Sequence, residues 1–440
     1  MRQEGVPKVP ERATPGTEAD RRWWWAEASI WTERMVSALV DGVKGGKWYS
    51  LMDKVIRPTT LEAAWRKVAR NAGSAGVDGV SIERFAAGSE RYLGELHRAL
   101  QDGSYRPSPI KRVEIPKGDG RVRPLGIPTV KDRIVQAALK MAIEPIFEVE
   151  FRPGSYGFRP GRGCKDALRE VDRLLKEGFT YAVDADLQSY FDSIPHDRLV
   201  GLVAGSISDS AVLSLVERFL EQDIVKGMAS WTPTTGTPQG AVISPLLANL
   251  YLHPLDVLME ESGYRMVRYA DDLVILCRTE ADALAALRLL SDWVSANGLT
   301  LHPDKTRVGD SHEAGQGFEF LGYRFEAGRR LVRKKSLKAL KDKVRSRTSR
   351  SRGDSLERII ADLNPVLRGW YNYFQHARSA LFDALDGFVR RRLRAILRKQ
   401  AKRPGIGRCR ADHQRWPNAF FAAHGLFTLY AVPTPARHSR

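Results

Sequence analysis

Apolar residues recur at every third or fourth position over long stretches of the chain, which is the spacing of a buried helix face. This pattern predicts a helical N-terminal region from Trp23 to about Val68 and a helical C-terminal region from Arg333 to about Lys402. Between them, the same spacing predicts helices over about 82–100, 131–147, 196–204 and 209–221.

Shorter segments are continuously apolar or alternate apolar and polar residues, as β-strands do. Residues 112–128 predict a hairpin, because the glycines at its centre suit a tight turn. Strands are predicted over 179–185 and 318–325, and two apolar strands lie within 266–277. Helices and strands mixed in this order predict an α+β fold.

The segment Tyr269-Ala270-Asp271-Asp272 interrupts an apolar β run. Hairpin turns usually take Asn-Gly or Asp-Gly, and two adjacent carboxylates are unfavourable unless a cation lies nearby. Taken alone, an Asp-Asp pair in a turn is more often solvated. The pair therefore indicates a metal site only in combination with other acids.

A second acidic group lies at and after the end of the strand predicted over 179–185, and it comprises Asp184, Asp186 and Asp192. Taken alone, Asp184 or Asp192 is also compatible with a turn or a helix cap. Hard oxygen ligands from two strands are what a pair of Mg²⁺ ions requires.

Three segments in order along the chain resemble the motifs of one polymerase family. Residues 269–272 resemble the signature turn of reverse transcriptases, and residues 186–192 resemble their first catalytic motif. Residues 236–249 resemble the nucleotide-binding loop and helix of group II intron enzymes. The resemblance covers roughly residues 30–430 and implies a right-hand polymerase with fingers, an antiparallel palm sheet and a helical thumb.

The resemblance implies a metal site made by the carboxylates of Asp186, Asp271 and Asp272, with the backbone carbonyl of Leu187 as a further ligand. Two Mg²⁺ ions are the expected cofactors, and Mn²⁺ is a possible substitute. Asp184 is the alternative to Asp186, since it lies two residues earlier on the same strand face.

Nucleotide contacts are also implied by the resemblance. Lys117 and Arg123 flank the hairpin turn and are expected to hold the triphosphate, although a solvated hairpin would carry them equally well. Phe191 is expected to exclude a 2′-hydroxyl, with a core aromatic as the alternative. Gln239 is expected near the nascent base pair, and Lys305 near the triphosphate.

Net charge locates a nucleic-acid surface. The chain carries 70 basic and 52 acidic residues, a net charge of +18. Residues 329–410 hold 25 basic and 6 acidic residues, which is +19, so the remainder is close to −1. A neutral body with one basic module is typical of a polyanion-binding protein.

The basic module includes residues 363–374, which resemble the maturase segment of intron-encoded proteins. An amphipathic helix with many arginines follows; such a helix would also suit a membrane surface, but the upstream polymerase motifs favour RNA. Residues 320–323 resemble the primer grip at the palm–thumb junction. The residues expected to contact RNA or template are Arg159, Arg162, Arg368, Arg390, Arg391, Arg392 and Arg394.

These patterns predict a division of the chain into successive modules. The expected modules are a disordered tail (1–22), an N-terminal helical extension (23–80), fingers (81–178), palm (179–328, with fingers-side helices at about 196–222), basic thumb or maturase domain (329–410) and a C-terminal tail (411–440).

Cys164, Cys277 and Cys409 are widely spaced, which excludes a Cys-x-x-Cys zinc module and a disulfide framework. The first twenty residues lack the apolar core of a signal peptide, and no apolar run is long enough for a membrane span. A cytoplasmic protein is therefore expected, and the resemblance implies a bacterial one that is nucleoid-associated when it acts on DNA. The missing cysteines also predict that the C-terminal endonuclease of many relatives is absent, as in the compact class C.

The expected function is RNA-directed DNA polymerisation together with binding of the parent intron RNA for splicing and retrohoming. Expected partners are group II intron RNA, an RNA template with a DNA primer, deoxynucleoside triphosphates and target DNA. A maturase with a vestigial polymerase and a stand-alone host enzyme for repair or defence are the alternatives. The sequence does not give the oligomeric state.

Overall fold

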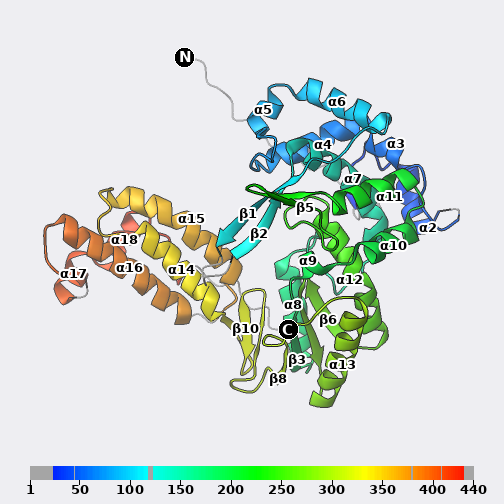
Figure 1. Ribbon diagram of the computed structural model, residues 1–440. Coiled ribbons are helices and arrows are strands. Elements are labelled where there is room, and N and C mark those ends of the chain that lie inside the picture. Colours follow the sequence, from blue (N-terminus) through cyan, green and yellow to red (C-terminus); the bar gives the residue numbers. More distant parts are fainter. Residues whose placement is uncertain (1–22, 44, 117–121, 378–379, 408, 431–440) are drawn as a thin grey trace.

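A computed structural model describes the chain except for residues 1–22, 44, 117–121, 378–379, 408 and 431–440. The expected tail 1–22 and Lys117 lie outside the described residues. Figure 1 shows N-terminal helices at one end, a palm sheet at the other, and a separate helical lobe formed by the C-terminal part. None of the described helices combines the length and the apolar character that crossing a bilayer requires.

The N-terminal region is a set of short helices and not one long one. They are α2 (Glu33–Asp41), α3 (Met52–Val55), α4 (Pro58–Arg70), α5 (Ile82–Ala86) and α6 (Ser89–Gln101), followed by the long α7 (Val130–Glu148). Gly42 ends α2 with a positive φ of 84°, and Pro58 starts α4 at a position where its missing N–H costs nothing. The helical region expected from Trp23 to about Val68 is therefore divided into α2, α3 and α4.

The predicted hairpin is present as β1 (Ile110–Pro116) and β2 (Val122–Ile127), which pair antiparallel. A second hairpin, β4 (Ile224–Lys226) and β5 (Ala229–Trp231), extends this sheet in the order β2-β1-β4-β5. The sequence patterns did not predict the second hairpin. The two joined hairpins project from the helices of the N-terminal half (Figure 1).

The palm sheet joins strands that are distant in sequence. It contains β3 (Tyr181–Asp186), β6 (Arg265–Tyr269), β7 (Asp272–Cys277) and β8 (Arg307–Asp310), in the order β6-β7-β3-β8 with every pair antiparallel. Helix α13 (Glu280–Ala296) packs on β3, β7 and β8, and α8 (Cys164–Lys176) packs on β6 and β7. Side chains on the two faces of β7 belong to different core clusters, so the sheet is buried on both sides.

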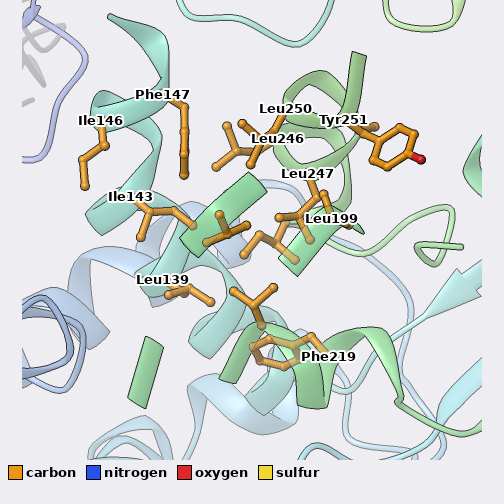
Figure 2. Close-up of a cluster of buried hydrophobic side chains, with 14 of the residues drawn as sticks. Leu139, Ile143, Ile146, Phe147, Leu199, Phe219, Leu246, Leu247, Leu250 and Tyr251 are labelled. Carbon is orange, nitrogen blue, oxygen red and sulfur yellow. The ribbon is translucent and has the colours of Figure 1, made fainter. Parts of the chain in front are cut away.

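A helical core supports this sheet. Besides α7 it contains α9 (Tyr190–Ser193), α10 (His196–Ser206), α11 (Ser210–Leu220) and α12 (Ser244–Glu261). Figure 2 shows Phe147 of α7, Leu199 of α10 and Leu247 of α12 converging in one apolar cluster, and each of them is fully buried. This packing fixes α12 beside the palm.

The C-terminal part starts with a three-stranded sheet, β9 (Phe318–Phe320), β10 (Tyr323–Glu326) and β11 (Arg329–Val332). The expected single strand over 318–325 is wrong, because Leu321 and Gly322 form a turn between β9 and β10. The helices that follow are α14 (Lys334–Arg347), α15 (Leu356–Phe374), α16 (Ala380–Gln400), α17 (Arg410–Arg415) and α18 (Asn418–Ala423).

The C-terminal segment is folded as far as the structure describes it. Phe421 and Leu429 are almost completely buried, and the carboxylate of Asp386 accepts hydrogen bonds from the backbone N–H groups of Leu429 and Tyr430. The expectation of a tail from residue 411 is therefore wrong up to Tyr430.

Candidate active site

The acidic pair lies in the tight turn between β6 and β7. Tyr269 pairs with Asp272 across the turn, and Ala270 has a positive φ of 60°. A Cβ on Gly157 would lie 2.2 Å from the Ala270 nitrogen, so only glycine permits this loop to pack against the turn. The Asn249 side chain of α12 donates a hydrogen bond to the Gly157 carbonyl over 2.7 Å.

The sheet register brings the two acidic motifs together. Asp186, the last residue of β3, pairs directly with Asp272, the first residue of β7. Burial raises the pKa of Asp271, and the neighbouring Asp186 raises it further. Burial, followed by the repulsion of Asp184, raises the pKa of Asp272 to about 7. These acids form a cluster whose charge a cation would stabilise.

Asp184 and Asp186 have different partners. The Asp184 carboxylate accepts hydrogen bonds from the Arg307 guanidinium and from the backbone N–H of Glu319, both at 3.2 Å. Asp186 forms a 2.5 Å ion pair with the Lys305 ammonium, and both side chains are nearly half exposed. Asp184 is thus engaged within the fold, which favours Asp186 as the metal ligand.

The chemistry of these side chains fits a divalent cation. Mg²⁺ prefers carboxylate oxygens, and the desolvated acids lack sufficient countercharge of their own. In the described part of the chain, no three Asp, Glu, His or Cys side chains converge as a ready-made metal site. The Lys305 ammonium holds the Asp186 carboxylate instead, so a bound metal ion would have to compete with Lys305.

The fingers hairpin meets the loop before α12. The Arg123 Nε donates to the Gln239 side-chain oxygen over 3.0 Å, and the Gly126 N–H donates to the Gln239 carbonyl over 2.6 Å. The positive charge of Arg123 also lowers the pKa of Asp271, although less than burial raises it. Arg123 and Gln239, two predicted nucleotide contacts, therefore lie together, with Arg123 near the acidic turn.

Phe191 lies between the acidic strand and the same loop. Its ring is 8% exposed and packs edge-on against Tyr190, and its carbonyl accepts a 2.6 Å hydrogen bond from the Thr237 N–H. Phe191 also lines a cleft of about 320 Å³ together with Thr237 and Pro238. Leu187 is buried and pairs with Leu301, which precedes the Lys305 loop.

Comparison with known proteins identifies the family of the chain. Residues 115–325 match the family model for reverse transcriptase (RNA-dependent DNA polymerase), and residues 337–416 match the group II intron maturase-specific domain. Protein YkfC of Escherichia coli (strain K12) is 34% identical over 327 residues, which cover 65% of this chain and 84% of YkfC. The chain belongs to the reverse transcriptase family.

Group II intron-encoded protein LtrA of Lactococcus lactis subsp. cremoris is 36% identical over 203 residues, which cover 46% of this reverse transcriptase and 34% of LtrA. The chain thus spans about a third of LtrA. A solved structure, the partial Cas6-RT-Cas1–Cas2 complex, matches over 56% of this chain and 41% of that one, with 23% identity and a TM-score of 0.36. The predicted family and the right-hand polymerase class are confirmed.

Arg268 is a site residue that the sequence analysis missed. This reverse transcriptase buries its guanidinium completely, and the group bonds Asp256 at 2.5 and 2.7 Å. It also donates to the Ala270 carbonyl over 2.9 Å, to Asn249 over 3.0 Å and to Ser155 over 2.8 Å. Arg268 therefore ties the acidic turn to α12 and to the loop around Gly157. An arginine within an otherwise apolar strand is the signal that could have revealed it.

Two of the arginines expected to contact RNA or template, Arg159 and Arg162, have structural partners. Arg159 is 6% exposed, pairs with Glu148 at 2.6 Å and donates to the carbonyls of Arg152 and Ser155. Its expected template contact is corrected to a structural role, because its guanidinium is directed at these oxygens inside the fold. Arg162 is half-buried and donates to the Pro153 carbonyl over 2.7 Å.

The thumb arginines divide into two groups. Arg394 is 2% exposed and bonds the Trp416 carbonyl and Asn418, and Arg392 bonds the hydroxyl and carbonyl of Thr348. The expectation that Arg394 binds RNA is therefore corrected, since its guanidinium is buried between the thumb helices. The remaining predicted RNA contacts are the exposed Arg368 and the half-buried Arg390, Arg391 and Arg392.

We expect Arg268→Met to lower the free energy of unfolding by about 3–5 kcal/mol, because it leaves the Asp256 carboxylate buried without a partner. Urea unfolding measures this change. The double variant Arg268→Met/Asp256→Leu should recover most of the stability yet still lose polymerase activity, since the Ala270 carbonyl no longer has its donor. A double variant with wild-type activity would contradict a positioning role for Arg268.

We also expect divalent-ion binding to strengthen as the pH rises toward about 7, because the metal must displace a proton from Asp272. Because folding raises the pKa of Asp272 from 3.8 to about 7, the folded protein holds a proton there that the unfolded chain has lost. The free energy of unfolding therefore falls as the pH rises from about 3.8 to about 7. Mn²⁺ binding followed by electron paramagnetic resonance from pH 6 to 8 checks this. Asp272→Asn should bind weakly at every pH; unchanged pH dependence in that variant would contradict the assignment.

Proposed function

We propose that this reverse transcriptase copies group II intron RNA into DNA at Asp186, Asp271 and Asp272. The single observation that supports this is the direct pairing of Asp186 with Asp272 beside the Asp271 turn. Both residues lie within residues 115–325, which match the reverse transcriptase model, and this supports a role for the pair in nucleotidyl transfer.

Two Mg²⁺ ions, or Mn²⁺ in their place, would supply activation of the primer 3′-hydroxyl and neutralisation of the leaving pyrophosphate. Asp186, Asp271, Asp272 and the Leu187 carbonyl are the proposed ligands. The Lys305 ammonium pairs with Asp186, and once a metal ion has displaced it, it would neutralise phosphate charge.

The remaining residues orient the substrates. Arg123 and Lys117 are the proposed partners of the triphosphate of the incoming deoxynucleotide, and Gln239 presents its amide to the nascent base pair. Phe191 has little freedom to move, because its backbone is bonded to the Gly236–Gln239 loop. A fixed ring beside the sugar leaves no room for a 2′-hydroxyl, so the proposed substrates are deoxynucleoside triphosphates.

The proposed modules follow the sequence expectation, with fingers over 81–178, palm over 179–328 and thumb over 329–410. The N-terminal extension covers residues 23–80. We propose that the thumb binds the intron RNA and assists its splicing, and that the palm holds an RNA template with a DNA primer. We also propose that the protein binds target DNA, that it is a class C enzyme and that it acts at the nucleoid.

Primer extension tests the polymerase assignment. With an RNA template, a DNA primer and Mg²⁺, we expect Asp271→Asn to reduce extension by at least about a thousandfold, because the variant lacks a metal ligand. Asp292→Asn removes an exposed carboxylate of α13 outside the proposed site and is the matched control. Robust extension by Asp271→Asn would contradict the metal assignment.

RNA binding across a salt series tests the thumb. Replacing Arg390 and Arg391 by Gln should weaken binding and reduce the slope of log K against log salt by about 0.7–0.9 for each phosphate that the variant no longer neutralises. The control removes two exposed arginines of the N-terminal helices, Arg66 and Arg91. An unchanged salt slope in the thumb variant would show that these residues do not bind phosphate.

A further inference from the structure

The turn between β9 and β10 places a leucine in a backbone conformation that favours glycine. Leu321 has a φ of 47° and the following Gly322 a φ of 83°, and Phe320 pairs with Tyr323 across the turn. A branched side chain at positive φ is disfavoured and persists where surrounding contacts determine the backbone. The contacts of Leu321 therefore indicate what this turn does.

On the palm side, the turn and its strand donate to the acidic cluster. The Leu321 N–H faces the Asp272 carboxylate and lowers its pKa, against the larger effect of burial. Two residues earlier, the Glu319 N–H donates a hydrogen bond to the Asp184 carboxylate over 3.2 Å. Alternate amides of this segment thus face two carboxylates on β7 and β3, one of which is a proposed metal ligand.

On the thumb side, the same turn is held by Tyr373 of α15. The Tyr373 hydroxyl donates to the Leu321 carbonyl over 2.8 Å, and the Tyr323 hydroxyl donates to the Tyr373 carbonyl over 2.6 Å. Burial raises the pKa of Tyr373, so its hydroxyl remains protonated and able to donate. A Cβ on Gly322 would lie 3.4 Å from the Phe374 ring, so the turn packs closely under α15.

We propose that Tyr373 is a positioning residue of the metal site. Through its hydrogen bond to the Leu321 carbonyl, it sets the position of the Leu321 N–H beside the Asp272 carboxylate and links the placement of the thumb to the ability of the palm to hold a divalent ion. The residue lies within the maturase-specific match, in the module proposed to bind RNA. This inference rests on the two-metal site proposed above.

The two tyrosine hydroxyls provide a matched pair of variants. Tyr373→Phe removes the donor to Leu321, whereas Tyr323→Phe removes a hydrogen bond at the same palm–thumb junction without touching Leu321. Mn²⁺ binding to the full chain, without primer or nucleotide, is measured by electron paramagnetic resonance. Hydrogen exchange of the Leu321 amide and thermal unfolding are measured alongside.

We expect Tyr373→Phe to weaken Mn²⁺ binding about fivefold, the effect of one neutral hydrogen bond, and to speed exchange of the Leu321 amide. Tyr323→Phe should lower thermal stability to a similar extent while keeping wild-type Mn²⁺ affinity. Unchanged affinity in Tyr373→Phe, or equal weakening in both variants, would overturn the inference. Absence of Mn²⁺ binding by the unaltered protein would instead overturn the proposed metal site itself.

Discussion

The buried guanidinium of Arg268 is the group on which the site depends. The β6–β7 turn presents two carboxylates whose pKa values are raised by burial and by neighbouring acids, so the arrangement is electrostatically unfavourable before any cation binds. Arg268 holds the turn through the Ala270 carbonyl and is itself anchored by Asp256 on α12. Its hydrogen-bonding groups are matched by partners in helix, turn and loop, which makes such a buried charge tolerable.

Other contacts also hold the β6–β7 turn in place. Gly157 lies against the backbone of the turn, Asn249 bonds both Arg268 and the Gly157 loop, and the Leu321 N–H faces the Asp272 carboxylate. Three segments that are distant in sequence, around residues 157, 249 and 321, thereby determine the position of one short acidic turn. The charges are also separated along the chain. The site acids lie in a nearly neutral body, and the excess of basic residues lies in the thumb.

Local patterns predicted the parts of this fold that local chemistry determines. The hairpin over 112–128 and the palm strands around Asp186 and Asp272 follow from apolar spacing and turn chemistry, whereas the catalytic motifs were identified by their resemblance to a known family. The turn at Leu321 was not predictable in that way, because its conformation depends on contacts with Asp272 and Tyr373, which are distant in sequence. Arg159 and Arg394 were misassigned for the same reason: a basic residue in a basic segment shows its partners only after folding.

Anomalous diffraction from crystals grown with Mn²⁺, a template–primer and an unreactive deoxynucleotide analogue tests the central claim most directly. The account predicts two peaks about 3.5–4 Å apart, each about 2.1 Å from carboxylate oxygens of Asp186 or the Asp271–Asp272 pair, with Lys305 displaced from Asp186. Peaks at other residues, or an intact Lys305–Asp186 pair with no metal beside it, would contradict it.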